Sequence, residues 1–354
     1  MVLPTSALSD SAAAAALICG DTGEILYSHG GNQPLPMAST TKIMTALLLC
    51  ETGELDKTLT VTEEMVRVEG SSMGLLPQDT VSYRDLLYGM MLASGNDAAT
   101  VTAYALGGSL SGFADRMNHR AQSMGLKNTH FVTPSGLDDQ NHYTTALDLA
   151  FLAREALKND EFAAACASQK ATLSYGNPPY QRSLTNHNRL LKTFDGLIGV
   201  KTGFTKRAGR CLVTAAKRDG RYVIAVTLND PNDWQDHEQL LNFGLSVVQS
   251  KTLSWQEQPS ELAVVGGTKL TVRLKNDSFS FCAATPDGVK QSVFLPSFVY
   301  APIQKDQPVG KVLYLSEDRV MGETTVFADE TVSANKSTLL QRYLAQILCI
   351  LKKL

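Results

Sequence analysis

The stretch Pro36-Met-Ala-Ser-Thr-Thr-Lys-Ile-Met-Thr-Ala-Leu-Leu-Leu-Cys50 places two polar groups where a buried helix ordinarily has none. From Ile43 onward nearly every residue is apolar and a good helix former, so the run predicts a helix that is buried on most sides. Ser39 and Lys42 are three residues apart, which brings a hydroxyl and an amine to one face of the helix at its N-terminal end. Such a helix has to lie within a sizeable packed core.

Ser39 and Lys42 are candidates for a nucleophile and its base. A serine hydroxyl becomes an effective nucleophile when a nearby base takes its proton, and a lysine can be that base when desolvation lowers its pKa. The apolar helix would supply that desolvation. The alternative is that Ser39 caps the helix and Lys42 is a solvated first-turn residue. A second Ser-x-x-Lys, Ser333-Ala-Asn-Lys336, has no apolar helix behind it, so the pair alone identifies no site.

Length and composition bound the organisation of the chain. With 354 residues, of which 44% are hydrophobic and 19% charged, it suits a large domain and a small one, each with a packed core. The net charge of −3 gives no support for a nucleic-acid partner, which needs a basic face. The six cysteines and six histidines are scattered without metal-binding spacing. We therefore expect no metal and no cofactor, and we interpret the cysteines as core residues.

The N-terminal residues bear on location. Val2-Leu-Pro-Thr-Ser-Ala-Leu resembles the end of a secretory cleavage region, with Thr5 and Ala7 at the positions that require small residues. This predicts export, so that the protein would act outside the cytoplasm. The C-terminal segment described below would then hold it on the outer face of the cytoplasmic membrane. The alternative is a frayed N-terminus. No run reaches the eighteen or so apolar residues of a membrane-spanning helix.

Strand and helix patterns follow one another up to about residue 250. The first two strands, 12–19 and 24–28, are joined by a polar turn and predict a hairpin. Further strands are expected over 59–62, 80–82, 197–205, 211–216 and 222–228, and further helices over 83–93, 98–106, 110–126, 144–157 and 236–250. The polar stretch 175–189 is assigned no element. The pattern predicts an α+β domain.

A second polar group, Ser94-Gly95-Asn96-Asp97, interrupts two apolar helical runs. A buried turn of this composition aims a hydroxyl and an amide at one point, with Gly95 free to take an unusual backbone angle. The triplet is also typical of an ordinary turn between two helices.

A third group, Lys201-Thr202-Gly203, lies on a predicted strand beside two strongly apolar strands. A cation and a hydroxyl that face a groove can hold a carboxylate, and a glycine lets a substrate backbone lie against the strand edge. The alternative is a surface lysine on an edge strand.

The three groups occur in the order Ser-x-x-Lys, Ser-x-Asn, Lys-Thr-Gly, each in its expected helix, interhelical loop or strand. With this set, the chain resembles the low-molecular-mass penicillin-binding proteins, specifically the D-alanyl-D-alanine carboxypeptidases. The likeness covers most of the chain and extends to 131–137, 187–191 and 208–213. It implies a serine peptidase domain over 1–253, with an antiparallel sheet flanked by helices as in the penicillin-binding proteins and β-lactamases.

The resemblance also implies the reaction. Ser39 would attack the carbonyl between the two terminal D-alanines of a peptidoglycan stem peptide, and Lys42 would accept its proton. Ser94 would relay a proton to the leaving amine. Water would then hydrolyse the acyl-enzyme and release D-alanine, and a penicillin would acylate Ser39 in the same way.

Substrate binding is likewise implied by the resemblance. Asn96 would hold the substrate amide, while Lys201 and Thr202 would hold the terminal carboxylate beside Gly203. The backbone N–H groups of Ser39 and Phe204 would form an oxyanion hole. Many relatives carry histidine after Lys-Thr-Gly, whereas this chain has Phe204, so only its main-chain donor is available there.

Two other functions are weighed against a carboxypeptidase. In a class A serine β-lactamase, the Glu of a Glu-x-x-Leu-Asn loop activates water between the second and third motifs. Glu238-Gln-Leu-Leu-Asn242 comes after the third motif and inside a predicted helix, so we interpret it as a chance match. The second alternative is a cell-wall binding or scaffold protein with a vestigial serine site, which the complete motifs disfavour.

From about residue 254 short strands alternate with Gly, Asp and Pro turns, which predicts a small all-β domain over 254–336. Residues 337–354 form the last segment, where Leu340, Leu344, Ile347 and Leu351 recur at helical spacing. We expect an amphipathic helix that binds the membrane surface, since it is too short and too polar to span a bilayer. The alternative is a helix docked on the β domain.

Overall fold

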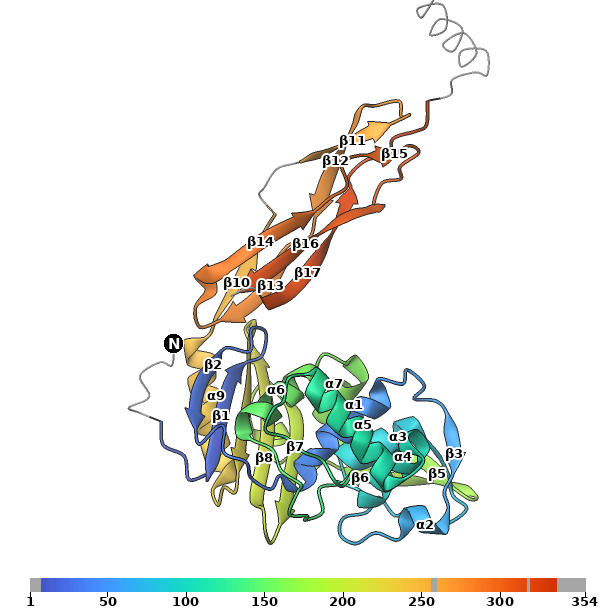
Figure 1. Ribbon diagram of the computed structural model, residues 1–354, viewed down its shortest axis with the longest axis vertical. Helices are drawn as coiled ribbons and strands as arrows, with labels where there is room; N and C mark the ends of the chain where they lie inside the picture. Colours follow the sequence, from blue (N-terminus) through green and yellow to red (C-terminus); the bar gives the residue numbers. More distant parts are fainter. Residues whose placement is uncertain (1–7, 256–259, 317–318, 336–354) are drawn as a thin grey trace, which may run out of the picture. The chain divides into compact units, whose positions relative to one another are not determined.

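The computed structural model describes residues 8–255, 260–316 and 319–335 (Figure 1). The chain divides into two compact units. The first comprises the residues up to Ser250 together with Cys282–Thr285, and the second comprises the other described residues from Lys251 onward. The boundary after residue 253 and the helix over 337–354 stay predictions, and the latter lies outside the described residues.

The first unit is built on a five-stranded sheet in which every neighbouring pair of strands is antiparallel. Alternate residues of its central strands belong to two cores: Ile18 lies in one and Leu17 in the other. Burial on both faces explains why these strands read as continuous apolar runs rather than as alternating patterns. The strands lie in the order β2 (Ile25–His29), β1 (Ala14–Cys19), β9 (Arg221–Leu228), β8 (Gly209–Arg218) and β7 (Leu197–Thr205).

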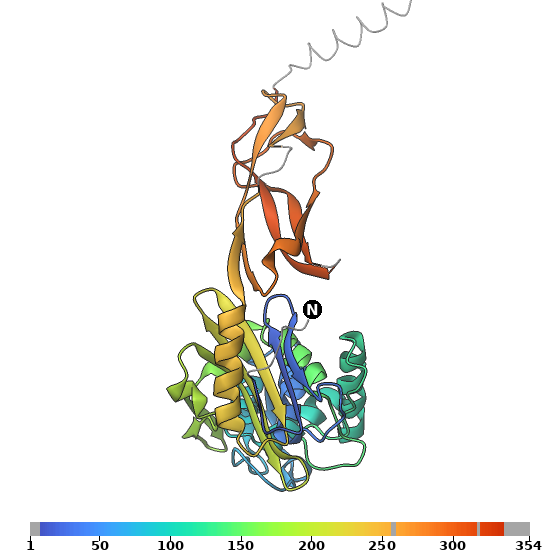
Figure 2. The ribbon, with the colours of Figure 1, turned by 90° about the vertical axis from the view of Figure 1, so that its left-hand side faces the viewer.

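Helices cover both faces of this sheet. On one face α9 (Asp233–Val247) packs against β1, β8 and β9 through Leu240 and Leu241; Figure 2 shows this helix lying along the strands. On the other face α6 (Ala146–Ala156) packs against β1 and β9. The hydrophobic core on this face also includes α1 and the helices around it, which are described next. The expected antiparallel sheet flanked by helices is confirmed.

The helix α1 (Lys42–Cys50) is buried at every position, as its sequence predicts. Its neighbours on the helical side are α3 (Tyr83–Met91), α4 (Asn96–Gly107), α5 (Leu110–Ser123), α6 and α7 (Asp160–Ala167). Two further helices are short: α2 (Glu63–Val66) and α8 (Leu190–Thr193). Enclosure of α1 by other helices removes its first residue, Lys42, from water, which matters for the chemistry below.

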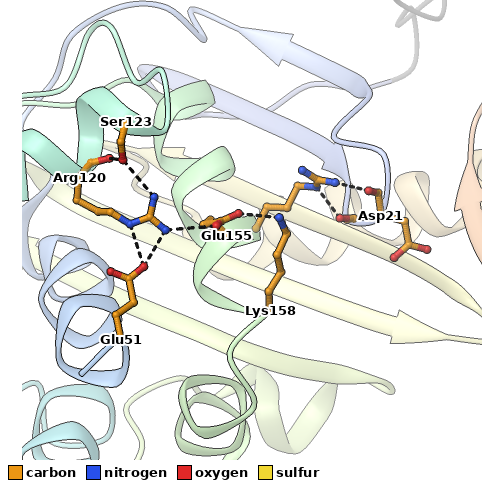
Figure 3. A network of polar contacts seen from close by, with 8 residues as sticks. Asp21, Glu51, Arg120, Ser123, Glu155 and Lys158 are labelled. Carbon is orange, nitrogen blue, oxygen red and sulfur yellow. Dashed lines mark hydrogen bonds and ion pairs between the residues drawn. The ribbon is translucent and has the colours of Figure 1, made fainter. Parts of the chain in front are cut away.

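A polar network joins three of these helices at the C-terminal end of α1, the end opposite Lys42 (Figure 3). Arg120 of α5 donates to the carboxylate of Glu51, just after α1, at 2.7 Å, and contacts Glu155 of α6 at 3.3 Å. Glu155 also accepts from Lys158 at 2.7 Å. Because the two acids flank one guanidinium, the ends of α1, α5 and α6 are held together by charge as well as by packing.

A second sheet was not anticipated in full. Its strands are β3 (Thr58–Thr60), β4 (Thr80–Ser82), β5 (Lys170–Gly176) and β6 (Pro179–Thr185). The β5–β6 hairpin covers most of the stretch that is assigned no element from the sequence. Most of its side chains are exposed, although Ala171, Leu173 and Tyr175 alternate along β5 and pack on the core. The hairpin is also held by Arg182, which stacks on the rings of Tyr175 and Tyr180 at 4.5 and 4.2 Å.

The second unit is all β among its described residues, and that prediction is confirmed. Its six-stranded sheet has the order β14 (Val289–Phe294), β16 (Pro308–Ser316), β17 (Arg319–Ala328), β12 (Thr271–Asn276), β11 (Glu261–Val265) and β15 (Val299–Tyr300). A separate pair is formed by β10 (Gln249–Leu253) and β13 (Phe279–Ala283). Within the described ranges no helix has the length and apolar character needed to cross a membrane.

The cysteines that the structure describes are buried and unpaired, in agreement with their interpretation as core residues. They are Cys19, Cys50, Cys166, Cys211 and Cys282.

Candidate active site

Ser39 lies in a short 3-10 turn, η1 (Ala38–Thr41), that runs directly into α1. The turn places the Ser39 hydroxyl oxygen 2.8 Å from the amine of Lys42, as the three-residue spacing predicts. Ala38, immediately before Ser39, has a φ of +47°, which is strained for a residue with a side chain. The nucleophile candidate is therefore presented by a tight, strained turn rather than by a regular helix.

Lys42 is fully buried and its amine meets three oxygen atoms. Besides Ser39, these are the side-chain oxygen of Asn96 at 2.7 Å and the carbonyl oxygen of Ser135 at 2.8 Å. Burial lowers the pKa of Lys42 well below its ordinary value, and the Lys201 cation acts in the same direction. A neutral amine has two hydrogens and one lone pair, so it can donate to Asn96 and Ser135 while its lone pair faces the Ser39 hydroxyl.

Ser94 lies in the turn between α3 and α4, where it meets the third motif. The amine of Lys201, on β7, donates to the Ser94 hydroxyl at 3.0 Å and to the Thr202 carbonyl at 2.8 Å. Burial lowers the pKa of Lys201 to about 7. The two lysines thus lie near each other in one buried region, and their mutual repulsion favours one cation rather than two.

The unusual backbone angle of this turn belongs to Ser94, with a φ of +56°, and not to Gly95. Gly95 has an ordinary φ of −57°, so the expectation for that residue was wrong. A Cβ atom at Gly95 would lie 2.7 Å from a carboxylate oxygen of Asp97 and 3.1 Å from the amide nitrogen of Met73. Lack of space, rather than backbone freedom, requires glycine there.

Gly203 lets β7 pack closely against η1, the turn that carries Ser39 and is called the nucleophile turn below. A Cβ atom at Gly203 would lie 3.0 Å from the backbone nitrogen of Ser39 and 3.1 Å from that of Thr40. The strand that carries the third motif therefore touches the main chain on both sides of the Ser39 carbonyl. Thr202 is half-buried, whereas the Phe204 ring is 66% exposed.

Asn96 is held on three sides. Its side-chain oxygen accepts from Lys42, one side-chain N–H donates to the Glu69 carbonyl at 2.7 Å, and its backbone N–H donates to the Ser71 carbonyl at 2.7 Å. An amide nitrogen carries two hydrogens, so one remains to donate to a ligand.

Two contributors to this site were not singled out from the sequence. The Ser135 carbonyl belongs to a loop that the pattern marks only as turn-rich. Asp97 accepts from the backbone N–H groups of Met73, Gly74 and Leu75, and thereby fixes the loop that contacts Asn96. A backbone carbonyl such as that of Ser135 cannot be recognised from residue type. Asp97 could have been recognised, because an Asp at the buried start of a helix commonly accepts hydrogen bonds from backbone N–H groups.

Glu238 is exposed on α9, which packs on the face of the sheet opposite the helical core that contains α1. It is therefore not placed to act on a group attached to Ser39. Across the described part of the chain, no set of three or more His, Cys, Asp or Glu side chains is arranged to hold a metal ion.

The helix, interhelical turn and edge strand thus converge. Ser39, Lys42 and Asn96 are joined by direct hydrogen bonds, Lys201 is bonded to Ser94, and Gly203 touches the Ser39 turn. A buried lysine beside a serine hydroxyl, with a second buried lysine bonded to a second serine, is the arrangement of an enzyme that transfers an acyl group to serine.

Comparisons with known proteins agree with this class. Residues 2–232 match the family model described as D-alanyl-D-alanine carboxypeptidase, and residues 249–334 match that of the penicillin-binding protein 5 C-terminal domain. The D-alanyl-D-alanine carboxypeptidase DacF of Bacillus subtilis is 34% identical over 341 residues, covering 92% of this chain and 87% of the relative. The chain therefore belongs to the D-alanyl-D-alanine carboxypeptidase family.

Solved structures give the same result. The D-alanyl-D-alanine carboxypeptidase DacD from Francisella tularensis has a TM-score of 0.66 at 26% identity, covering 95% of this chain and 97% of the other. A mutant of the Streptomyces K15 DD-transpeptidase has a TM-score of 0.65 at 32% identity, covering 67% of this chain and 99% of the other. The likeness thus extends to both units in the first case and covers about the length of the first unit in the second.

Proposed function

We propose that this protein removes the terminal D-alanine from peptidoglycan stem pentapeptides through an acyl-enzyme on Ser39. The observation that carries the proposal is the 2.8 Å contact between the Ser39 hydroxyl and the fully buried amine of Lys42. Desolvation keeps a lysine neutral, and a neutral amine can take the hydroxyl proton. Membership of the carboxypeptidase family supports the choice of substrate.

Acylation would proceed in two proton movements. The Ser39 oxygen attacks the carbonyl carbon between the two terminal D-alanines while its proton passes to Lys42. The carbon–nitrogen bond then breaks, and a proton delivered through Ser94 leaves with the amine as D-alanine. Lys201, bonded to the Ser94 hydroxyl at 3.0 Å, keeps that hydroxyl oriented.

The other residues would bind and stabilise. Lys201 and Thr202 would hold the terminal carboxylate at the edge of β7, and the remaining N–H of Asn96 would bind the substrate amide carbonyl. The backbone N–H groups of Ser39 and Phe204 would stabilise the tetrahedral oxyanion. Each such donor typically contributes about 3 kcal/mol. Gly203 supports the proposal, because a Cβ atom there would lie 3.0 Å from the Ser39 nitrogen, so the strand that carries Phe204 runs close to the turn that carries Ser39.

Water would complete the cycle by hydrolysing the acyl-enzyme. Penicillins would acylate Ser39 in the same way, since their strained amide presents a carbonyl next to a carboxylate. The exposed position of Glu238 on α9 leaves no support for a fast β-lactamase. A penicilloyl-enzyme should therefore persist, and penicillins should act as inhibitors.

We further propose that the protein acts outside the cytoplasm, on the outer face of the cytoplasmic membrane. The substrate class supports this location, and so does the cleavage-like sequence around Thr5 and Ala7. Residues 337–354, which lie outside the described residues, would bind the membrane surface as an amphipathic helix.

The direct test measures release of D-alanine from a diacylated Lys-D-Ala-D-Ala tripeptide. Ser39→Ala should abolish release and labelling by a fluorescent penicillin while the thermal unfolding curve stays that of the wild type. Ser333→Ala is the matched control, because Ser333 begins the other Ser-x-x-Lys of the chain. Equal release by wild type and Ser39→Ala would refute Ser39 as nucleophile, and a wild type that is neither labelled nor active would indicate a vestigial site.

A further inference from the structure

His142 is a buried residue outside the three motifs whose ring contacts two segments of the site. Its Nε2 atom lies 2.8 Å from the hydroxyl oxygen of Thr41, in the nucleophile turn. Its Nδ1 atom lies 2.9 Å from the backbone nitrogen of Val132 and 3.3 Å from that of Thr133. These two nitrogens begin the loop that ends in the carbonyl of Ser135, so one ring bridges the turn and the loop.

The two backbone N–H groups determine the tautomer of the ring. Because both point at Nδ1, that atom has to be the unprotonated acceptor, and the proton of the neutral imidazole lies on Nε2. Nε2 then donates to the Thr41 hydroxyl, which donates in turn to the carbonyl oxygen of Ala38 at 2.8 Å. Every donor in this chain of hydrogen bonds therefore has an acceptor. The chain ends at Ala38, the residue directly before Ser39.

The surroundings keep the ring neutral. The His142 side chain is buried and lies edge-on to the ring of Phe131 at 5.8 Å. Burial lowers the pKa of His142 to about 4, while Asp139 and Asp138 act against this shift and His130 acts with it. The donor and acceptor assignment therefore holds throughout the neutral range.

We propose that His142 and Thr41 are positioning residues for acylation, which hold the Ser39 turn and the Ser135 loop at a fixed separation around Lys42. The Ser135 carbonyl accepts from the Lys42 amine at 2.8 Å. Next to the nucleophile, Ala38 keeps a strained φ of +47° that needs continuous support. The inference rests on the function proposed above, in which Lys42 is the base for Ser39.

Loss of this bridge should alter Lys42 in a measurable way. Without it the Ser135 loop can move away from the amine and admit water. Because burial is the main cause of the lowered Lys42 pKa, hydration would raise that pKa. Acylation would then need a higher pH, in addition to becoming slower through misplacement of the reacting groups.

The experiment compares Thr41→Val, which keeps the shape and removes the hydroxyl, with Thr41→Ser, which keeps the hydroxyl. The second-order rate of labelling by a fluorescent penicillin is measured over pH in the full-length protein, with the stoichiometry of labelling as a count of intact sites. Thr41→Val should label about 10- to 100-fold more slowly, at full stoichiometry, with the acidic limb of its rate profile moved to higher pH. Thr41→Ser should retain most of the rate.

His142→Asn provides the second arm, since asparagine can keep an acceptor for the Val132 and Thr133 nitrogens but loses the Nε2 donor. His142→Asn should resemble Thr41→Val, and the double variant should be labelled no more slowly than the slower single variant, because both residues act through one bridge.

The proposal is overturned if Thr41→Val is labelled at the wild-type rate. It is also overturned if the only change is a reduced stoichiometry of labelling, with the acidic limb of the rate profile unmoved. Should Thr41→Val not fold, the same outcomes are judged on His142→Asn. A wild type not labelled on Ser39 overturns the proposed function as well, whereas normal wild-type labelling confines the failure to this inference.

Discussion

The amine of Lys201 lies 3.0 Å from the hydroxyl oxygen of Ser94, although the two residues are 107 positions apart in the chain. The contact joins the edge strand β7 to the turn between α3 and α4. Burial lowers the pKa of Lys201 to about 7. A small rise in pH from neutrality therefore removes the positive charge at this point of the site.

This titration predicts how activity depends on pH. Below its pKa Lys201 is charged and can hold the substrate carboxylate, so kcat/KM for the tripeptide should fall as pH rises through about 7. On the acidic side, kcat/KM should rise as Lys42 loses its proton. The control substrate is the same peptide with a C-terminal amide, which should show the acidic limb but not the alkaline fall. An identical alkaline fall with both substrates would mean that Lys201 does not act through the carboxylate.

Replacement of Lys42 by methionine should separate chemistry from folding. Methionine fills a similar volume without an amine to desolvate, so the protein should remain folded while loss of the base slows acylation by about 100-fold or more. Labelling kinetics and a thermal unfolding curve measure the two effects. The exposed Lys192 in α8, changed to methionine, is the matched control and should leave both unchanged. Acylation of Lys42→Met at the wild-type rate would assign the base to another group.

Gly203→Ala should slow acylation by about tenfold or more. The added Cβ would lie 3.0 Å from the Ser39 nitrogen, so β7 or the nucleophile turn has to shift by a few tenths of an ångström. The labelling rate measures the effect. Gly288→Ala is the control, because a Cβ there meets no atom of the described residues within 4 Å. If Gly203→Ala labels at the Gly288→Ala rate, the contact between strand and turn has no bearing on the reaction.

The network around Arg120 predicts a pH-dependent contribution to stability. Hydrogen bonds from Lys158 and then Arg120 lower the pKa of Glu155 from its ordinary 4.5. A lowered carboxyl pKa stabilises the fold above that ordinary value, and the contribution is lost as pH falls through the lowered pKa. Arg120→Met should therefore reduce the free energy of unfolding by about 1 kcal/mol at pH 7, and by less in acid.

Denaturant unfolding at pH 7 and at pH 4 measures this difference. The control is Arg67→Met, since Arg67 pairs with Glu63 on an exposed surface and its loss should change stability by less than about 0.5 kcal/mol. Equal losses for the two variants at both pH values would contradict a special role for the network.

Deletion of residues 337–354 should release the protein from lipid vesicles without loss of carboxypeptidase activity. The physical reason is that the helical spacing of Leu340, Leu344, Ile347 and Leu351 predicts the apolar face that would enter the membrane surface. Sedimentation with vesicles and D-alanine release measure the two properties. Unchanged sedimentation after the deletion would mean that the anchor lies elsewhere.

Long apolar runs separated by turn residues allowed most of the first unit to be predicted. The opening hairpin, α1 and the strands β7 to β9 are apolar runs buried on several sides, so their composition alone identifies them. The β5–β6 hairpin and α7 were missed. In the hairpin only β5 alternates, through Ala171, Leu173 and Tyr175, whereas β6 exposes nearly all of its side chains. The stacking of Arg182 on two tyrosines adds a contact that no local pattern reveals.

Some groups of the candidate site could be predicted from the sequence and others could not. Ser39, Lys42, Ser94, Asn96 and Lys201 are predictable because polar residues interrupt apolar elements. The structure brings them together as two neighbouring hydrogen-bonded groups, Ser39–Lys42–Asn96 and Ser94–Lys201. Their catalytic and binding roles stay predictions. The Ser135 carbonyl and the His142 ring could not be found in the same way. One is a main-chain acceptor, and the other is a single histidine whose partners, Thr41 and Val132, are fixed only by the tertiary fold.

The position of β7 at the end of the five-stranded sheet has a consequence for recognition. One side of this strand pairs with β8, and the other has no strand partner among the residues that the structure describes. An extended peptide that enters beside Lys201 can therefore continue the ladder as a sixth strand, bound through its own amides. Binding of this kind depends on the backbone conformation of the peptide and on the configuration at each Cα atom more than on the identity of the side chains. It is therefore compatible with a peptide that ends in two D-alanines, whose side chains are only methyl groups.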